Sequence, residues 1–222
     1  MPDHPQKVRI DVISDVVCPW CFIGKRRLEK AIALTPDIPV EVHYHPFFLN
    51  DWIPAEGISR EQYLTTKFGS PERYKDIATR VTAAAEEDGL VYAVDKVSRQ
   101  PNTTDSHRLI HWAGQQGKAA EMKQRLMDLY FSQGADLSDK AVLASAGGDV
   151  GLDAGKVAEW LDSDADLDTV TKQVETAKSS GIEGVPFFIF DNTLAVSGAQ
   201  APEQLAQVIR RAAEDRKQKV AS

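Results

Sequence analysis

Hydrophobic and polar residues alternate in two stretches near the start of the chain. Apolar side chains at positions 8, 10 and 12 alternate with charged ones at 7, 9 and 11, which predicts a strand with one better-buried face. Residues 40–49 alternate in the same way and predict a second strand. Between them, apolar residues from Cys21 to Leu34 follow helical spacing, and the prolines of segment 35–39 end this helix. A strand–helix–strand unit predicts that the two strands are parallel.

The middle of the chain, residues 59–180, has an almost purely helical pattern. Apolar residues recur every three or four positions, glycines follow several of the helical stretches, and oxygen-bearing side chains stand at helix starts. The predicted helices span residues 60–69, 71–89, 103–117, 118–134, 138–151, 153–163 and 166–181.

The pattern returns to strands near the end of the chain. Residues 184–190 are a short apolar run, Asp191 and Asn192 form a turn, and residues 193–198 predict the returning strand of a hairpin. Residues 201–219 predict a closing helix, with Pro202 in its first turn.

This order predicts an α/β fold with a split sheet. Neither the β half at the start nor the one at the end could bury its faces alone, so the two should pair. We therefore predict a discontinuous sheet domain of residues 1–58 and 181–222, interrupted by an all-helical domain of residues 59–180.

Cys18 and Cys21 are the only cysteines, and they lie where the first strand passes into the first helix. The free N–H groups and the dipole of a helix start favour a thiolate at Cys18. One helical turn would bring the two sulfurs within bonding distance. We predict that Cys18 is exposed and attacks first, and that the more shielded Cys21 resolves the mixed disulfide. A C-x-x-C beside a βαβ unit is a thioredoxin-like signature.

Two other interpretations of the cysteines stay open. They could be incidental buried thiols, or half of a metal site completed by His43 and His45, which share one face of the second strand. Zinc needs four ligands, and nothing in the pattern places these histidines at the helix start, so no metal is predicted. His107 and His111 have i, i+4 spacing but no H-E-x-x-H glutamate, which favours packing or surface roles.

Pro186 interrupts the short apolar strand of the hairpin, where a proline would break the sheet ladder. A cis Val185–Pro186 bond would account for it and would leave the Val185 backbone free to pair with an extended peptide or a thiol ligand. A trans proline at the first residue of an edge strand is the other explanation. Trp20, between the cysteines, offers a partly exposed apolar surface to a substrate.

Composition describes an ordinary soluble globular protein, with 42% hydrophobic and 27% charged residues. The net charge of −7 argues against a nucleic-acid partner, and no apolar run is long enough to span a membrane. The first residues have no basic region leading into a continuous apolar run, so they do not resemble a secretory signal. We therefore expect a cytoplasmic protein.

Three segments together resemble the DsbA-like FrnE family of thiol–disulfide oxidoreductases. They are SDVVCPWCFIGKRRLE at 14–29, PNTTDSHRL at 101–109, and GIEGVPFFIF with VSGAQAPEQL at 181–205. The resemblance implies a thioredoxin-like fold with an inserted helical domain, a nucleophilic Cys18, a resolving Cys21 and a cis-Pro186 beside them. The residues expected at the substrate are Pro19, Trp20, Val185, Asn102 and Gly198.

A related branch uses the same scaffold differently. In 2-hydroxychromene-2-carboxylate isomerases and kappa-class glutathione transferases, a serine that activates glutathione replaces Cys18. This chain keeps both cysteines, which favours redox chemistry. No cofactor is required, although glutathione could act as a redox partner. Lys25, Arg26 and Arg27 could attract its carboxylates, or could simply form a solvated basic helix face.

The sequence therefore predicts a thiol–disulfide oxidoreductase, with disulfide isomerisation as a further activity. Its expected partners are protein or small-molecule disulfides, and the chain could form a homodimer. The alternatives are a glutathione-dependent isomerase or transferase for a small aromatic molecule, and a non-enzymatic peptide-binding holdase with redox-sensing thiols.

Overall fold

The computed structural model describes residues 7–221, and its sheet begins with a parallel pair of strands. β1 (Val8–Ser14) and β2 (Val40–Pro46) run parallel, with Val8 opposite Val40 and Ser14 opposite Pro46. The helix α1 (Pro19–Ala33) connects them. The predicted βαβ unit is confirmed, and alternation along β1 places Val8, Ile10 and Val12 on one buried face.

The hairpin near the end of the chain completes this sheet. β5 (Phe187–Phe190) pairs antiparallel with β1, and β6 (Leu194–Ser197) pairs antiparallel with β5, so the strand order is β2-β1-β5-β6. Asp191 and Asn192 have φ of 49° and 57°. These left-handed values match the twist that a tight hairpin needs. The split sheet predicted from the sequence is therefore correct.

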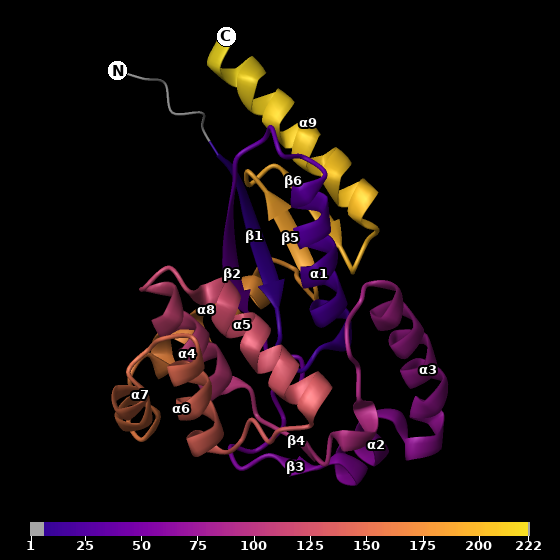
Figure 1. The fold of residues 1–222 in the computed structure, drawn as a ribbon, viewed down its shortest axis with the longest axis vertical. Helices are drawn as coiled ribbons and strands as arrows, with labels where there is room; N and C mark the ends of the chain where they lie inside the picture. Colours follow the sequence, from indigo (N-terminus) through magenta and orange to yellow (C-terminus); the bar gives the residue numbers. More distant parts are fainter. Residues whose placement is uncertain (1–6, 222) are drawn as a thin grey trace.

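One face of the sheet is covered by α1 and by α9 (Pro202–Ala221), as Figure 1 shows. Inward-facing side chains of β1 and β5 pack there against Leu28 of α1 and against Leu205 and Ile209 of α9. All of these side chains are buried, so this layer is a conventional helix-on-sheet core.

Helices and two very short strands fill the chain between β2 and β5. In order they are β3 (Ile58–Ser59), α2 (Arg60–Phe68), α3 (Pro71–Glu87), the 3-10 turn η1 (Val94–Lys96), β4 (Arg99–Gln100), α4 (Thr104–Gly114), α5 (Ala119–Met127), η2 (Asp128–Gln133), α6 (Lys140–Asp149), α7 (Ala154–Leu161) and α8 (Leu167–Ser179). Each predicted helix is present, within a few residues at its ends.

Two features of this part differ from the prediction. The single helix expected over 118–134 changes at Asp128 into a π-helical turn, η2, which widens the helix locally. The paired strands β3 and β4 were not predicted, because two residues each are too short for alternation to be visible.

The helical part lies at the end of the sheet where α1 begins (Figure 1). One buried apolar cluster runs from Cys21 and Phe22 into this part, and the rings of Phe22 and Phe131 stack with centroids 5.1 Å apart. The core is therefore continuous across the predicted boundary. The division into two domains stays a prediction. Its outer limits include residues 1–6 and 222, which lie outside the described residues.

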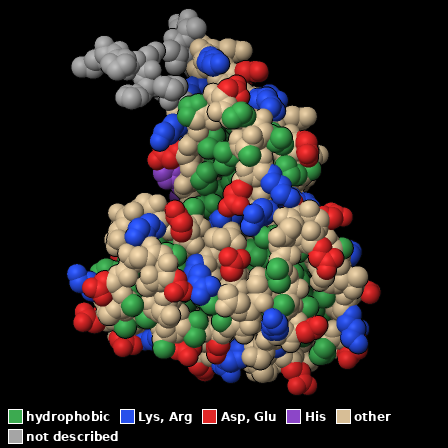
Figure 2. Space-filling view, in the orientation of Figure 1, with side chains coloured by type: hydrophobic (Ala, Val, Ile, Leu, Met, Phe, Trp, Pro, Cys, Tyr) green, Lys and Arg blue, Asp and Glu red, His purple; other side chains and the backbone are tan. Residues whose placement is uncertain are grey.

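The charges on the visible face of the helical part are mixed in sign (Figure 2). Figure 2 shows Lys or Arg and Asp or Glu side chains interspersed over it. Among the described residues, no helix has both the length and the low polarity that crossing a bilayer requires.

Candidate active site

Cys18 caps the N-terminus of α1, where the sequence placed it. Its extended backbone, with φ −88° and ψ 114°, turns the chain from the strand into the helix. Its carbonyl accepts hydrogen bonds from the N–H groups of Cys21 and Phe22, at 3.0 and 3.1 Å. Pro19 occupies the first turn, where its missing N–H costs no helical hydrogen bond. Cys21 lies on the same helix, inside the first turn.

The expectation that Cys18 is exposed is wrong, because only 3% of it is accessible. Side chains of α2, α3 and η2 extend over the start of α1 and leave a partly open cavity of about 230 Å³ above the thiol. Trp20 and Val185 also line this cavity. The sequence could not reveal this cover, since the covering residues lie more than 40 positions away along the chain.

The hairpin places Val185 and Pro186 against the thiol. The Cys18 thiol donates to the Val185 carbonyl, with 3.5 Å between sulfur and oxygen, so that carbonyl is already engaged. The Val185–Pro186 bond is cis, as predicted. Gly24 of α1 makes room for it: a Cβ there would lie 2.9 Å from the Pro186 Cγ. The Gly198 N–H donates to the Pro186 carbonyl at 2.8 Å and holds the segment from the other side.

Cys21 is only 1% exposed. Burial raises the pKa of the Cys21 thiol well above its ordinary value, and the neighbouring Cys18 adds to the increase. The positive charge of Lys123 opposes it. Cys21 is therefore held as a thiol, which suits the second rather than the first attacking group.

The cavity above Cys18 carries two cations and no carboxylate among its lining residues. The Arg60 guanidinium carbon lies 5.1 Å from the ring centroids of both Tyr63 and Tyr74. Lys67 lies 5.6 Å from the Tyr63 ring centroid and donates to the Asn50 side-chain oxygen, and burial lowers the pKa of Lys67. The cavity is thus aromatic and positively charged.

Sequence reasoning missed these residues, although a signal for them existed. Arg60, Tyr63 and Lys67 follow i, i+3, i+7 spacing, so they share one face of α2. The face carries polar and aromatic groups rather than aliphatic ones, and such a face is easily mistaken for a solvated surface.

A buried polar pair lies behind the cysteines. Asp15 is completely buried and accepts hydrogen bonds from the N–H groups of Val16 and Leu49, at 2.7 and 2.8 Å. His107 Nε2 lies 3.1 Å from the same carboxyl group. Burial lowers the pKa of His107, and contact with Asp15 partly offsets this effect. His107 is therefore a packed residue, as predicted, with an acidic partner that was not predicted.

The other histidines of residues 7–221 also have carboxylate neighbours, and His111 lies 3.6 Å from Asp166. His45 lies 2.6 Å from Asp11, and His43 lies 3.4 Å from Glu41. Within residues 7–221, no group of three or more His, Cys, Asp or Glu side chains is arranged to hold a metal ion.

The predicted substrate-binding residues fall into two groups. Pro19, Trp20 and Val185 line the cavity at Cys18, and Trp20 is 38% exposed, as expected for a residue at its edge. Asn102 and Gly198 do not line it. The Asn102 side chain donates to the Ile53 carbonyl and accepts from the Thr104 N–H, so it fixes the start of α4. A ligand contact for these two residues stays a prediction.

The basic stretch of α1 is solvated only in part: the Arg26 side chain is 38% exposed, whereas Lys25 and Arg27 have partners within the protein. Lys25 is buried and donates to Glu29 and Gln124, and Arg27 pairs with Asp88. Because α5 and the end of α3 pack on α1, these cations are committed to contacts within the protein.

Comparison with known proteins agrees with this geometry. The DSBA-like thioredoxin domain family matches the chain over residues 9–210. A probable DsbA oxidoreductase from Streptomyces coelicolor is 32% identical, with a TM-score of 0.85 over 92% of this chain and 89% of that one. These matches confirm the predicted thioredoxin-like α/β fold.

Two more distant structures share the fold. A 2-hydroxychromene-2-carboxylate isomerase is 15% identical, with a TM-score of 0.70 over 96% of this chain and 99% of its own. The cytosolic disulfide reductase DsbM from Pseudomonas aeruginosa, solved with GSH, is 17% identical, with a TM-score of 0.65 over 91% of this chain and 98% of its own. At these identities the likeness concerns the fold alone.

Proposed function

Because the chain belongs to the DSBA-like thioredoxin domain family, we propose that it is a thiol–disulfide oxidoreductase of the FrnE type, acting through Cys18 and Cys21. The observation that carries the proposal is the position of Cys18, which caps α1 and touches the Val185 carbonyl. Cys18 thus lies at a helix N-terminus, a position that favours anions in general, and the buried thiol of Cys21 follows within one turn.

The reaction is two successive exchanges. The Cys18 thiolate attacks one sulfur of a substrate disulfide, the substrate S–S bond breaks, and the departing sulfur takes up a proton. Cys21 then loses its proton and attacks the Cys18 sulfur, which releases the second substrate thiol. The substrate gains two electrons and two protons, and the Cys18–Cys21 disulfide forms. The reverse sequence oxidises a dithiol, and incomplete resolution permits isomerisation.

The cavity favours negatively charged substrates. Its cations Arg60 and Lys67 face no lining carboxylate, so a disulfide that carries carboxylates would gain favourable charge contacts near Cys18. Glutathione disulfide has this chemistry, and glutathione is our proposed redox partner. Protein disulfides would have to enter as an extended segment past Trp20. We place this activity in the cytoplasm, where glutathione is the main thiol buffer.

Serine substitutions at the two cysteines test the proposal. Cys18→Ser should abolish dithiol-dependent reduction of glutathione disulfide and of a protein disulfide, since a hydroxyl cannot enter thiol–disulfide exchange. Cys21→Ser should instead accumulate a mixed disulfide at Cys18, detectable by mass spectrometry, because attack proceeds without resolution.

The same variants separate this function from a glutathione-dependent isomerase or transferase. In that case the reactive sulfur belongs to glutathione, and Cys18→Ser should keep or gain activity toward a small aromatic substrate. Unchanged disulfide reduction by Cys18→Ser would exclude the proposed mechanism.

A further inference from the structure

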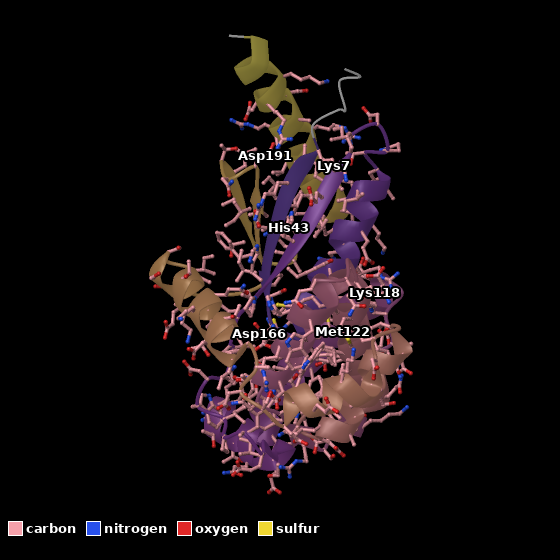
Figure 3. The ribbon with its side chains drawn as sticks, turned by 90° about the vertical axis from the view of Figure 1, so that its left-hand side faces the viewer. Lys7, His43, Lys118, Met122, Asp166 and Asp191 are labelled. Carbon is pink, nitrogen blue, oxygen red and sulfur yellow. The ribbon has the colours of Figure 1, made fainter. Side chains whose placement is uncertain are left out.

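A second cavity lies between the edge strand β2 and the helices α4 and α5. It measures about 540 Å³ and shares no lining residue with the cavity at Cys18. In Figure 3, His43 marks its sheet side, while Met122 on α5 and Asp166 lie below, in the helical part. We refer to it as the β2 groove. Its volume falls within the range of about 300–1,000 Å³ typical of small-molecule sites.

The basic residues that line the β2 groove are almost all paired. Each of its four histidines lies near a carboxylate: His43 with Glu41, His45 with Asp11, His107 with Asp15 and His111 with Asp166. The ammonium group of Lys123 makes no hydrogen bond and no ion pair with any residue that the structure describes. The ring of Tyr44 lies beside it, with the ring centroid 5.7 Å from the ammonium nitrogen.

Lys123 is also deeply buried, at 1% exposure, although it lines the groove. An ammonium group removed from water without a partner costs free energy, so such a group either loses its proton or binds an anion. Burial lowers the pKa of Lys123 to about 8, while the negative charge of Asp15 acts in the opposite direction. At pH 7 the protonated amine therefore still dominates, and the charge is available to a ligand.

The residues that line the β2 groove indicate what the uncharged part of such a ligand would be. Val42, Ile110 and Ala120 give the groove apolar surface, and Glu41 is its only lining carboxylate. The Glu41 side chain is 56% exposed and lies beside His43. It therefore does not neutralise Lys123. A ligand that matches these features has one negative group and an apolar body.

We propose that the β2 groove is a binding site for a small organic carboxylate, whose carboxylate group pairs with the Lys123 ammonium while its apolar part packs between β2 and the helices. The site is separate from the Cys18 cavity and does not depend on the proposed redox function.

Calorimetric titration of the full-length protein at pH 7 with benzoate and benzamide tests this site. The two molecules have nearly the same shape, and benzamide has no charge. Wild type should bind benzoate about 10-fold to 100-fold more tightly than benzamide, the range expected for a charged hydrogen bond. Lys123→Met keeps the length of the side chain without its charge, and should lose this preference.

Lys118→Met is the matched control. Lys118 precedes the same helix, donates to the Gly151 carbonyl at 3.0 Å and does not line the groove, so its removal should leave benzoate binding unchanged. The comparison of benzoate with benzamide uses the wild-type protein, so it remains valid even if a variant fails to fold. No benzoate binding, equal affinity for the two molecules, or an unchanged preference in Lys123→Met would overturn the proposal.

Discussion

At the scale of single residues, the two thiols differ in surroundings although they lie three positions apart. Cys18 borders a cavity, whereas Cys21 is packed in the core with a raised pKa. In the single-cysteine variants, iodoacetamide should therefore alkylate Cys18 at least about ten times faster than Cys21 at pH 7. The rates can be measured by mass spectrometry, and equal rates would contradict the assignment of Cys18 as nucleophile.

The charge of the cavity gives a second prediction for the same residue. Lys67 faces Cys18 across the cavity, so Lys67→Met should slow alkylation of Cys18 by the anionic reagent iodoacetate more than by neutral iodoacetamide, by about threefold to tenfold in the ratio of rates. Lys75→Met, on the exposed side of α3, is the control and should not change the ratio. An unchanged ratio in Lys67→Met would show that the cation does not act on the thiol.

The sequence was informative about residues whose role depends on local spacing. The C-x-x-C pair, the proline of the hairpin and the partly exposed Trp20 were all identified from their immediate neighbours. Asp15 and Lys123 were not, because their importance comes from burial beside groups about a hundred residues away in the sequence. A single sequence shows the type of such a residue and does not show what surrounds it.

At the scale of elements, periodicity located the helices and the four main strands because apolar residues recur on one side of each of them. It failed where an element departs from regular geometry. The π-helical turn of η2 keeps apolar residues at helical intervals, so its sequence resembles an α-helix, and only the structure reveals the change at Asp128.

The packing of α1 on α3 gives an element-scale prediction. Asp88, at the end of α3, accepts from Arg27 and Lys30 of α1, at 2.6 and 2.7 Å. Burial disfavours its charge, but these hydrogen bonds outweigh burial and lower the pKa of Asp88. Asp88→Asn should therefore reduce the free energy of unfolding at pH 7 by about 1–3 kcal/mol, measured by urea denaturation.

The sign of the pH dependence follows from the lowered pKa. The stabilisation by Asp88 is fully present above the unfolded-state value of about 3.9 and is lost as pH falls through the lower folded-state value. The difference between wild type and Asp88→Asn should shrink over that acidic window. A difference that stays constant down to the acid limit of folding would contradict the ion-pair account.

At the scale of the whole molecule, the split sheet was predictable and the cover over Cys18 was not. Two half-sheets separated by helices must combine to bury their faces, and this requirement follows from the sequence alone. How the helical part closes over the start of α1 depends on side chains of α2, α3 and η2, which share one apolar cluster or cavity with Cys18. We expect this cover to limit access to the Cys18 sulfur to groups that can enter the cavity.

The central claim is that Cys18 and Cys21 form a reversible redox pair. Equilibration of the protein in glutathione buffers of varied potential, followed by acid quenching and mass spectrometry, tests it directly. We predict one transition in which two hydrogens are lost together and a Cys18–Cys21 disulfide forms, with the slope of a two-electron couple, about 30 mV for each tenfold change in ratio. Thiols that stay reduced throughout, or that accumulate only stable glutathione adducts without an internal disulfide, would contradict the account.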